Sequence, residues 1–122
     1  MKDKKQDNRP DEPDFDSASD PLLLAGCHFI FFTDNEEAAM TCIDESIRMN
    51  PLSARAWYTK GFLLMLQDEL EQALKCYEKT IELRPTFGVV WSNKSGVLKK
   101  LGRHKEADYC QEKSRELCLQ GY

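Results

Sequence analysis

Two side chains with catalytic potential, Cys27 and His28, are adjacent in the sequence. A thiol and an imidazole act as nucleophile and base only when the ring can take the thiol proton. Successive residues of an α-helix point about 100° apart, so neighbours on a helix do not make that contact. The second histidine, His104, has no cysteine or serine beside it that would form such a pair. We therefore expect no catalytic site.

Three of the four remaining cysteines show a long regular spacing instead of a ligand cluster. Cys42, Cys76 and Cys110 lie 34 residues apart, which places them in different structural units. Zinc sites combine cysteine and histidine at short spacings, and no histidine accompanies these thiols at such a spacing. Small, half-buried packing residues are the simpler interpretation. Because a phosphate-binding glycine loop is also missing, the sequence predicts neither a metal nor a cofactor.

The composition argues against several classes of partner. The 122 residues carry a net charge of −4, a balance that disfavours nucleic acid and anionic membrane surfaces. The longest apolar stretch, residues 21–32, is too short to span a bilayer, and the acidic residues before it are unlike a signal peptide. The five cysteines include no C-x-x-C pair, which is typical of a reducing compartment. We expect a cytoplasmic protein.

A charged N-terminal segment precedes the part of the chain that can fold. Residues 1–19 contain four basic and six acidic side chains, and apart from Met1 their one large apolar residue is Phe15. Such a segment buries too little apolar surface to offset its ordering entropy, so we expect a disordered tail followed by one domain over residues 20–122. Two alternatives stay open: a docking motif around Phe15, and a tail that folds back onto Lys99 and Lys100.

Capping and stop signals predict that the domain is entirely helical. The starting signals are Asp20 before Pro21, the capping-box pairs Asp34 with Glu37 and Asp68 with Glu71, and the N-cap Ser53. The ending signals are Pro51, Pro85 and Gly102. The predicted helices cover residues 21–33, 35–49, 54–67, 69–83, 88–101 and 103–118.

The chain matches itself when it is shifted by 34 residues. The recurring positions hold residues of one kind: Trp57 and Trp91; Ala39, Ala73 and Ala107; the small Cys27, Gly61 and Ser95; the aliphatic Ile30, Leu64 and Leu98; Pro51 and Pro85. Two helices of a short hairpin approach closely only where one contact is small. A single hairpin cannot bury its apolar face alone, so three of them should stack into a short solenoid.

These residues resemble the tetratricopeptide repeat family. The middle repeat carries the family's Trp57, Gly61, Ala73, Tyr77 and Pro85 in place. The resemblance implies three helix-turn-helix repeats, at about 20–53, 54–87 and 88–121, in a right-handed solenoid. Polar Gln111 and Arg115 on the last helix, where earlier repeats have apolar residues, lead us to expect no fourth repeat. Lys60 and Lys94 depart from the family, and we expect their stems to cover apolar surface while the ammonium groups reach water.

The first helix of each repeat has a second stripe of side chains, and in the resembling family this stripe lines a groove that receives peptides. The groove residues expected here are Leu24, His28, Phe31, Phe32, Arg55, Tyr58, Thr59, Phe62, Met65, Leu66, Asn93, Lys99 and Lys100. The groove should be aromatic at one end and basic at the other. The alternative is that much of the stripe packs between adjacent first helices.

The resemblance implies a protein-binding adaptor and no enzyme. Family members that grip a chaperone's C-terminal carboxylate do so with lysine, asparagine and arginine. Here Asn93 matches one clamp asparagine, but the accompanying basic positions hold Leu24, Tyr58 or Val89, which argues against a chaperone tail as partner. The partner is therefore another protein or peptide. The alternative is a self-associating scaffold, a homodimer formed through the apolar stripe or the terminal repeat.

Overall fold

The computed structural model describes residues 21–121, which form six helices. They are α1 (Pro21–Phe32), α2 (Glu36–Met49), α3 (Ala54–Leu66), α4 (Leu70–Leu83), α5 (Gly88–Lys100) and α6 (His104–Leu119). Every predicted helix is present, with each end within one residue of its predicted position. The all-helical fold is thus confirmed. The predicted tail and the Asp20 cap lie outside the described residues.

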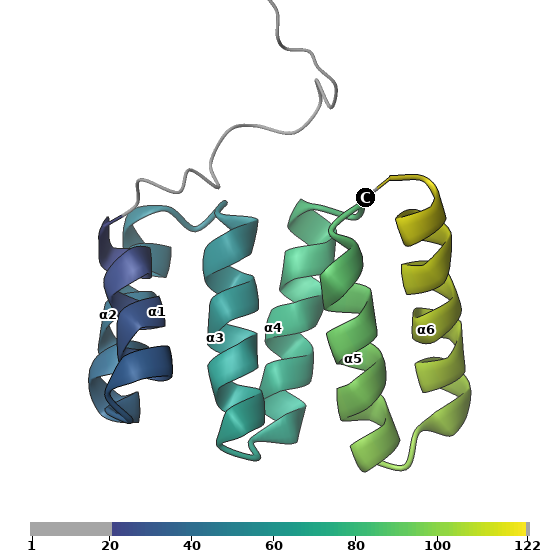
Figure 1. Ribbon diagram of the computed structural model, residues 1–122, viewed down its shortest axis with the longest axis horizontal. Helices are drawn as coiled ribbons and strands as arrows, with labels where there is room; N and C mark the ends of the chain where they lie inside the picture. The colour runs from purple at the N-terminus through teal and green to yellow at the C-terminus, as the bar shows by residue number, and fades with distance from the viewer. Residues whose placement is uncertain (1–20, 122) are drawn as a thin grey trace, which may run out of the picture.

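The helices form three antiparallel hairpins, α1–α2, α3–α4 and α5–α6, stacked in a row (Figure 1). Each second helix contacts the first helix of the next hairpin, and the first helices α1, α3 and α5 also contact one another in sequence. The first helices consequently begin at the same end of the molecule (Figure 1). This arrangement is a helical-repeat solenoid, as the period predicted.

The core lies between the layers of helices, and the small residues of the repeat stand at its tightest points. Ala39, Ala73 and Ala107 are all fully buried, as is Tyr77, the largest completely enclosed side chain. The thiols of Cys76 and Cys110 are also buried. The packing role predicted for these two cysteines is therefore confirmed.

A glycine lets the two helices of each of the first two hairpins approach. A Cβ added to Gly61 would lie 2.7 Å from Cε1 of Tyr77, and one added to Gly26 would lie 2.7 Å from Cγ1 of Ile43. The sequence period had assigned this contact to Cys27 in the first hairpin, which is wrong by one residue. Ile43 leaves no room for a side chain opposite it. Gly26 is therefore the residue of α1 that faces α2 at this contact.

The turn inside each hairpin contains one residue with a positive φ, again at a spacing of 34. Asp34 has φ 56°, Asp68 has φ 62° and Gly102 has φ 81°. Around Asp68 the amides of residues 68 and 69 donate to the carbonyls of Met65 and Leu64, at 3.0 and 2.9 Å. The same pair of bonds surrounds Gly102, and this pairing is the Schellman ending of a helix.

The predicted capping boxes are wrong for the same reason. A residue that ends one helix in the left-handed region cannot also be the extended N-cap of the next. The side chain of Asn35, not Asp34, caps α2 by accepting from the amide of Ala38 at 3.0 Å. The N-cap of α4 is Glu69, which makes no side-chain capping bond. Ser53 does cap α3, as predicted, by accepting from the amide of Ala56 at 3.2 Å.

We expect Asp68→Gly to raise the free energy of unfolding by about 0.5–1 kcal/mol, because glycine adopts a positive φ without a Cβ clash. Gly102→Ala, the reverse change at the equivalent turn, should lower it by a similar amount. Urea unfolding followed by circular dichroism measures both. A loss of stability in Asp68→Gly would mean that the aspartate side chain contributes more than its backbone strain costs.

Two tryptophans fix the turns between hairpins. The Nε1–H of Trp57 donates to the carbonyl of Pro51 at 2.9 Å, and that of Trp91 donates to the carbonyl of Pro85 at 3.0 Å. Each bond ties a first helix to the turn that precedes it. The sequence showed that both residue types recur, but it did not show that they are bonded to each other.

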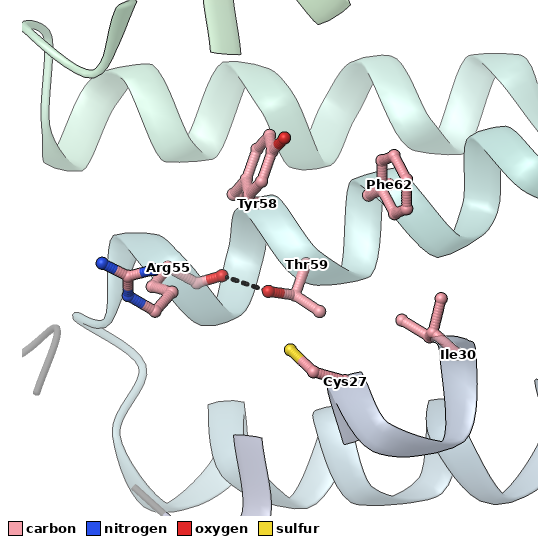
Figure 2. Close-up of a pocket in the computed structure, with 6 residues that line it drawn as sticks. All are labelled: Cys27, Ile30, Arg55, Tyr58, Thr59 and Phe62. Carbon is pink, nitrogen blue, oxygen red and sulfur yellow. Dashed lines mark hydrogen bonds between the residues drawn. The ribbon is translucent and has the colours of Figure 1, made fainter. Parts of the chain in front are cut away.

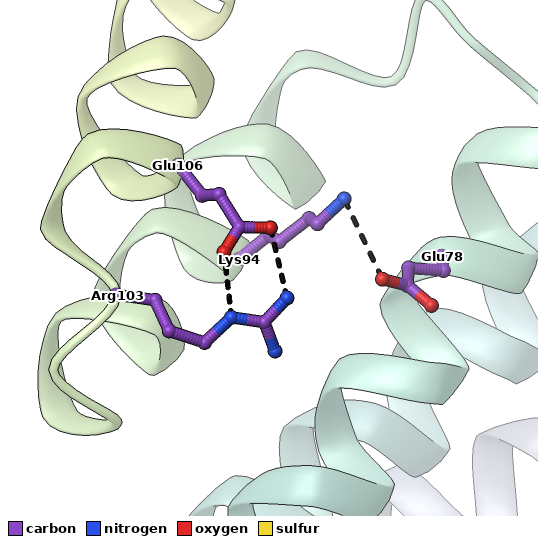
Figure 3. A network of polar contacts seen from close by, with 4 residues as sticks. All are labelled: Glu78, Lys94, Arg103 and Glu106. Carbon is purple, nitrogen blue, oxygen red and sulfur yellow. Dashed lines mark hydrogen bonds and ion pairs between the residues drawn. The ribbon is translucent and has the colours of Figure 1, made fainter.

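Ion pairs join consecutive hairpins at equivalent positions. Lys60 Nζ lies 2.9 Å from Asp44, and Lys94 Nζ lies 3.9 Å from Glu78 (Figure 3). Both lysine side chains are largely covered, at 28% and 18% exposed. Their ammonium groups therefore meet a carboxylate of the preceding hairpin instead of ending only in water. Beside Lys94, Arg103 pairs with Glu106 (Figure 3), and Nε of Arg103 lies 2.6 Å from Oε1 of Glu106.

Candidate functional site

A small pocket opens between α1 and α3. Its volume is about 160 Å³. The lining residues are Cys27 and Ile30 from α1 and Arg55, Tyr58, Thr59 and Phe62 from α3 (Figure 2). All four α3 residues are among those predicted from the sequence to line a groove. The sequence predicts Cys27 and Ile30 on the core side. Ile30 does pack against the core cluster of Ala39, Ile43 and Leu63 as well as lining the pocket, whereas Gly26 takes the helix contact expected of Cys27.

The α3 residues meet at the pocket because of helical spacing. Positions 55, 58, 59 and 62 recur at intervals of three and four residues, so their side chains share one face. The Thr59 hydroxyl donates to the carbonyl of Arg55 at 2.8 Å (Figure 2). Because this bond already uses the Thr59 hydroxyl proton, and most other side chains at the pocket are apolar, the walls of the pocket are mainly apolar. Arg55 is the one charged side chain among the six that line it.

Tyr58 is a fixed wall of the pocket. Its ring centroid lies 5.3 Å from that of Phe87 and 6.0 Å from that of Tyr77. The side-chain amide of Asn93 donates to the Tyr58 hydroxyl at 2.9 Å, across α3 and α5. Burial raises the pKa of Tyr58, and the Asn93 hydrogen bond only partly opposes it. The phenol is therefore neutral at physiological pH.

The predicted second stripe divides into an exposed part and a packed part. Leu24, Phe32 and Leu66 are 53%, 75% and 53% exposed. Met65 is half-buried, and its sulfur lies 3.9 Å from the Tyr77 hydroxyl. Tyr58 and Phe62 are also half-buried. We call Leu24 and Leu66, each one helical turn from a pocket residue, together with the six pocket residues the groove surface.

The other predicted groove residues lie apart from the pocket or outside the described side chains. His28 is exposed, with its ring 5.2 Å from that of Phe32. Lys99 and Lys100 are exposed at the end of α5, whereas Arg55 is at the start of α3. Because α3 and α5 run in the same direction, the lysines and Arg55 stand at opposite ends of the molecule. The side chain of Phe31 lies outside the described residues.

Other kinds of site find little support between residues 21 and 121. Burial raises the pKa of the Cys76 and Cys110 thiols, which makes them poor nucleophiles. Cys27 faces the pocket while the neighbouring His28 ring packs against Phe32. Over the described range, no three metal-ligating side chains converge. None of its helices has the length and hydropathy to cross a membrane.

Comparison with known proteins gives a sequence match for the middle hairpin. Residues 54–87 match the family model of the tetratricopeptide repeat. These boundaries are the ones that the 34-residue period predicted for the second repeat. No curated protein sequence is significantly similar to the chain.

Solved structures extend the likeness to the whole described domain. A crystal structure of MamA superposes with a TM-score of 0.77 at 23% identity, covering 81% of this chain and 57% of that one. A second MamA crystal structure gives a TM-score of 0.74 at 27% identity, covering 85% and 56%. A structure of a CopN–Scc3 complex gives 0.72 at 21% identity, covering 79% and 56%.

This chain spans a little over half the length of those proteins. The likeness to them is one of fold, whereas the match at residues 54–87 is one of sequence. The tetratricopeptide repeat is a protein-interaction fold and carries no catalytic machinery of its own. The sequence match, the 34-residue period and the three stacked hairpins together show a tetratricopeptide repeat at residues 54–87 within a three-hairpin solenoid that shares the fold of the MamA structures.

Proposed function

We propose that the chain is an adaptor that binds a peptide segment of another protein on the groove surface. The observation that carries the proposal is the α1–α3 pocket, an apolar cavity lying on the same helices as the exposed Leu24 and Leu66. Exposed apolar residues gathered around a cavity mark interaction surfaces. One ligand side chain would enter the pocket and others would cover the exposed residues.

The charges favour a ligand that is apolar with acidic flanks. Arg55 adds positive charge at the rim of the pocket, which favours a carboxylate near the anchoring side chain. Lys99 and Lys100 would orient a second acidic group farther along the ligand. Asn93 already donates to Tyr58, so its amide is less available to grip a ligand's backbone. This supports the view that a chaperone C-terminal tail is not the partner.

Selection from a random peptide library displayed on phage tests the proposal. We expect selected peptides to share one large apolar residue flanked by Asp or Glu. Titrating a selected peptide into the isotope-labelled protein should move the amide signals of Ile30, Thr59 and Phe62 in the NMR spectrum. The proposal fails if the peptides lack such a residue, or if the largest shifts fall on α6.

The alternative function is a self-associating scaffold in which the groove surface of one copy covers that of another. The exposure of Leu24 and Leu66, at 53% each, favours it, because a dimer would bury these side chains. Light scattering over a wide range of protein concentration separates the two functions. A monomer throughout supports the adaptor, whereas a dimer that blocks peptide binding supports the scaffold. For either function we propose a cytoplasmic location.

A further inference from the structure

We propose that Asn93, which does not line the α1–α3 pocket, determines the size of the side chain that the pocket accepts. Its amide lies behind the Tyr58 ring and keeps this wall of the pocket from moving back. The pocket then admits a group of the size of a phenylalanine or leucine side chain and excludes the indole of tryptophan. The inference rests on the proposed function in one respect, namely that the pocket accepts an apolar side chain.

The Tyr58 ring lies between the pocket and Asn93. Helix α3 lies between α1 and α5 and contacts both of them. The pocket is on the α1 side of the ring, where Cys27 and Ile30 form the opposite wall. The Tyr58 hydroxyl points away from those two residues (Figure 2), and Asn93 of α5 donates to it at 2.9 Å. A larger occupant of the pocket would push the ring toward α5, where the Asn93 amide blocks it.

The aromatic neighbours of Tyr58 limit its other movements. Its ring centroid lies 5.3 Å from that of Phe87, 6.0 Å from that of Tyr77 and 6.4 Å from that of Phe62. Tyr77 is fully buried, and Phe62 is itself a wall of the pocket. Asn93 is polar and only partly buried. It is therefore the neighbour whose truncation opens space behind the ring without removing a core side chain.

The volume of the pocket sets the size limit. The pocket measures about 160 Å³, and a cavity of about 150 Å³ holds a benzene ring. A phenylalanine ring or a leucine side chain therefore fills it. Indole carries a second, fused ring, and an oversized group in a packed space displaces its neighbours at a cost in free energy. Because the Asn93 hydrogen bond resists that displacement, a tryptophan side chain should bind less tightly than a phenylalanine side chain.

Asn93→Ala should allow the pocket to enlarge from behind. The change removes the hydrogen bond and empties the space that the amide filled, so the Tyr58 ring can retreat toward α5. Asn93→Asp is the matched control, because aspartate has the same size and the Tyr58 hydroxyl can donate to its carboxylate. That variant should keep the size limit.

The test uses toluene and 3-methylindole, the isolated side-chain groups of phenylalanine and tryptophan, as uncharged probes of the full-length protein. In NMR titrations of the unchanged protein, toluene should shift the amide signals of Ile30, Thr59 and Phe62 with an affinity about tenfold higher than that of 3-methylindole. The two affinities should differ by less than about threefold in Asn93→Ala and again by about tenfold in Asn93→Asp. A variant that had only lost stability would bind both probes less tightly and leave the ratio of affinities unchanged.

The probes and the library peptides separate this inference from the proposed function. A ratio that stays the same in Asn93→Ala would overturn the inference, as would pocket signals that respond to neither probe. If a selected peptide binds although the ratio does not change, the adaptor function stands and Asn93 does not set the size limit. If the ratio changes as expected but no peptide binds, Asn93 does set the size limit and the adaptor function fails.

Discussion

Gly61→Val should lower the free energy of unfolding by about 3 kcal/mol, at the upper end of the usual cost of overpacking a core. An added Cβ would lie 2.7 and 2.9 Å from two ring carbons of Tyr77 and 3.2 Å from Cβ of Cys76. Tyr77 is fully buried, so its ring cannot swing into solvent. The α3–α4 hairpin would have to widen, and that would disturb the ring contact between Tyr77 and Tyr58 at the pocket.

Gly96→Ala is the matched control for this prediction. Gly96 is also inside a first helix, α5, but nothing lies within 4 Å of the Cβ that the change would add. Alanine is the better helix former, so this variant should gain about 0.5–1 kcal/mol. Urea unfolding measures both variants. Equal stabilities for Gly61→Val and Gly96→Ala would show that the close helix contact at Gly61 does not hold the hairpin together.

Combining Phe62→Ala with Leu66→Ala should weaken the binding of a selected peptide by about 100-fold or more. A buried anchor contact at an interface commonly contributes 2 kcal/mol or more, roughly a 30-fold change in affinity. Phe62 lines the pocket and Leu66, one turn farther along α3, is 53% exposed. Calorimetric titration measures the affinity, and thermal unfolding shows whether the fold is kept.

The control for the binding prediction removes the same kind of surface elsewhere. Leu52→Ala with Leu119→Ala deletes two leucines that are 50% and 84% exposed, in the α2–α3 connection and at the end of α6. Affinity should stay within about threefold of the unchanged protein, as expected for residues outside an interface. A comparable loss in both double variants would contradict binding at the groove surface.

Tyr58 is a less suitable target than its position in the pocket suggests. Its ring packs against Phe87 and Tyr77, and its hydroxyl accepts from Asn93. Truncation to alanine would open a cavity and leave the Asn93 amide without this acceptor, so a loss of binding could reflect a loss of fold. Tyr58→Phe removes only the hydroxyl and is the better probe of that hydrogen bond.

The bonds between hairpins explain how such a short solenoid can present a shaped pocket. The Lys60–Asp44 pair joins the first hairpin to the second, while the Trp57–Pro51 hydrogen bond fixes the turn between them. The pocket lies between α1 and α3, the first helices of those hairpins. A site whose walls are already fixed loses less entropy when a ligand binds.

Much of the fold was predictable because it depends on short-range patterns. Helix ends follow from proline, glycine and serine signals that act over a few residues, and all twelve came within one residue of their predicted places. The 34-residue period predicted the three hairpins and the repeat type of residues 54–87 without any coordinates. The helical spacing also placed Arg55, Tyr58, Thr59 and Phe62 on one face, where the pocket lies.

Tertiary structure alone decided the details that depend on distances between helices. Whether Gly26 or Cys27 faces α2 depends on the space around Ile43, which no local pattern records. The left-handed turns at Asp34 and Asp68 have the same sequence pattern as a capping box, because aspartate is favoured both at a positive φ and as a helix N-cap.

The division of the predicted stripe into exposed and packed residues had the same origin. Phe32 and Leu66 stay exposed, while Tyr58 packs against Phe87 of the next hairpin and bonds to Asn93. The sequence determined which residues share a face of a helix. Only the packing of neighbouring hairpins decided which of them stay exposed, because burial is set by atoms that are distant along the chain.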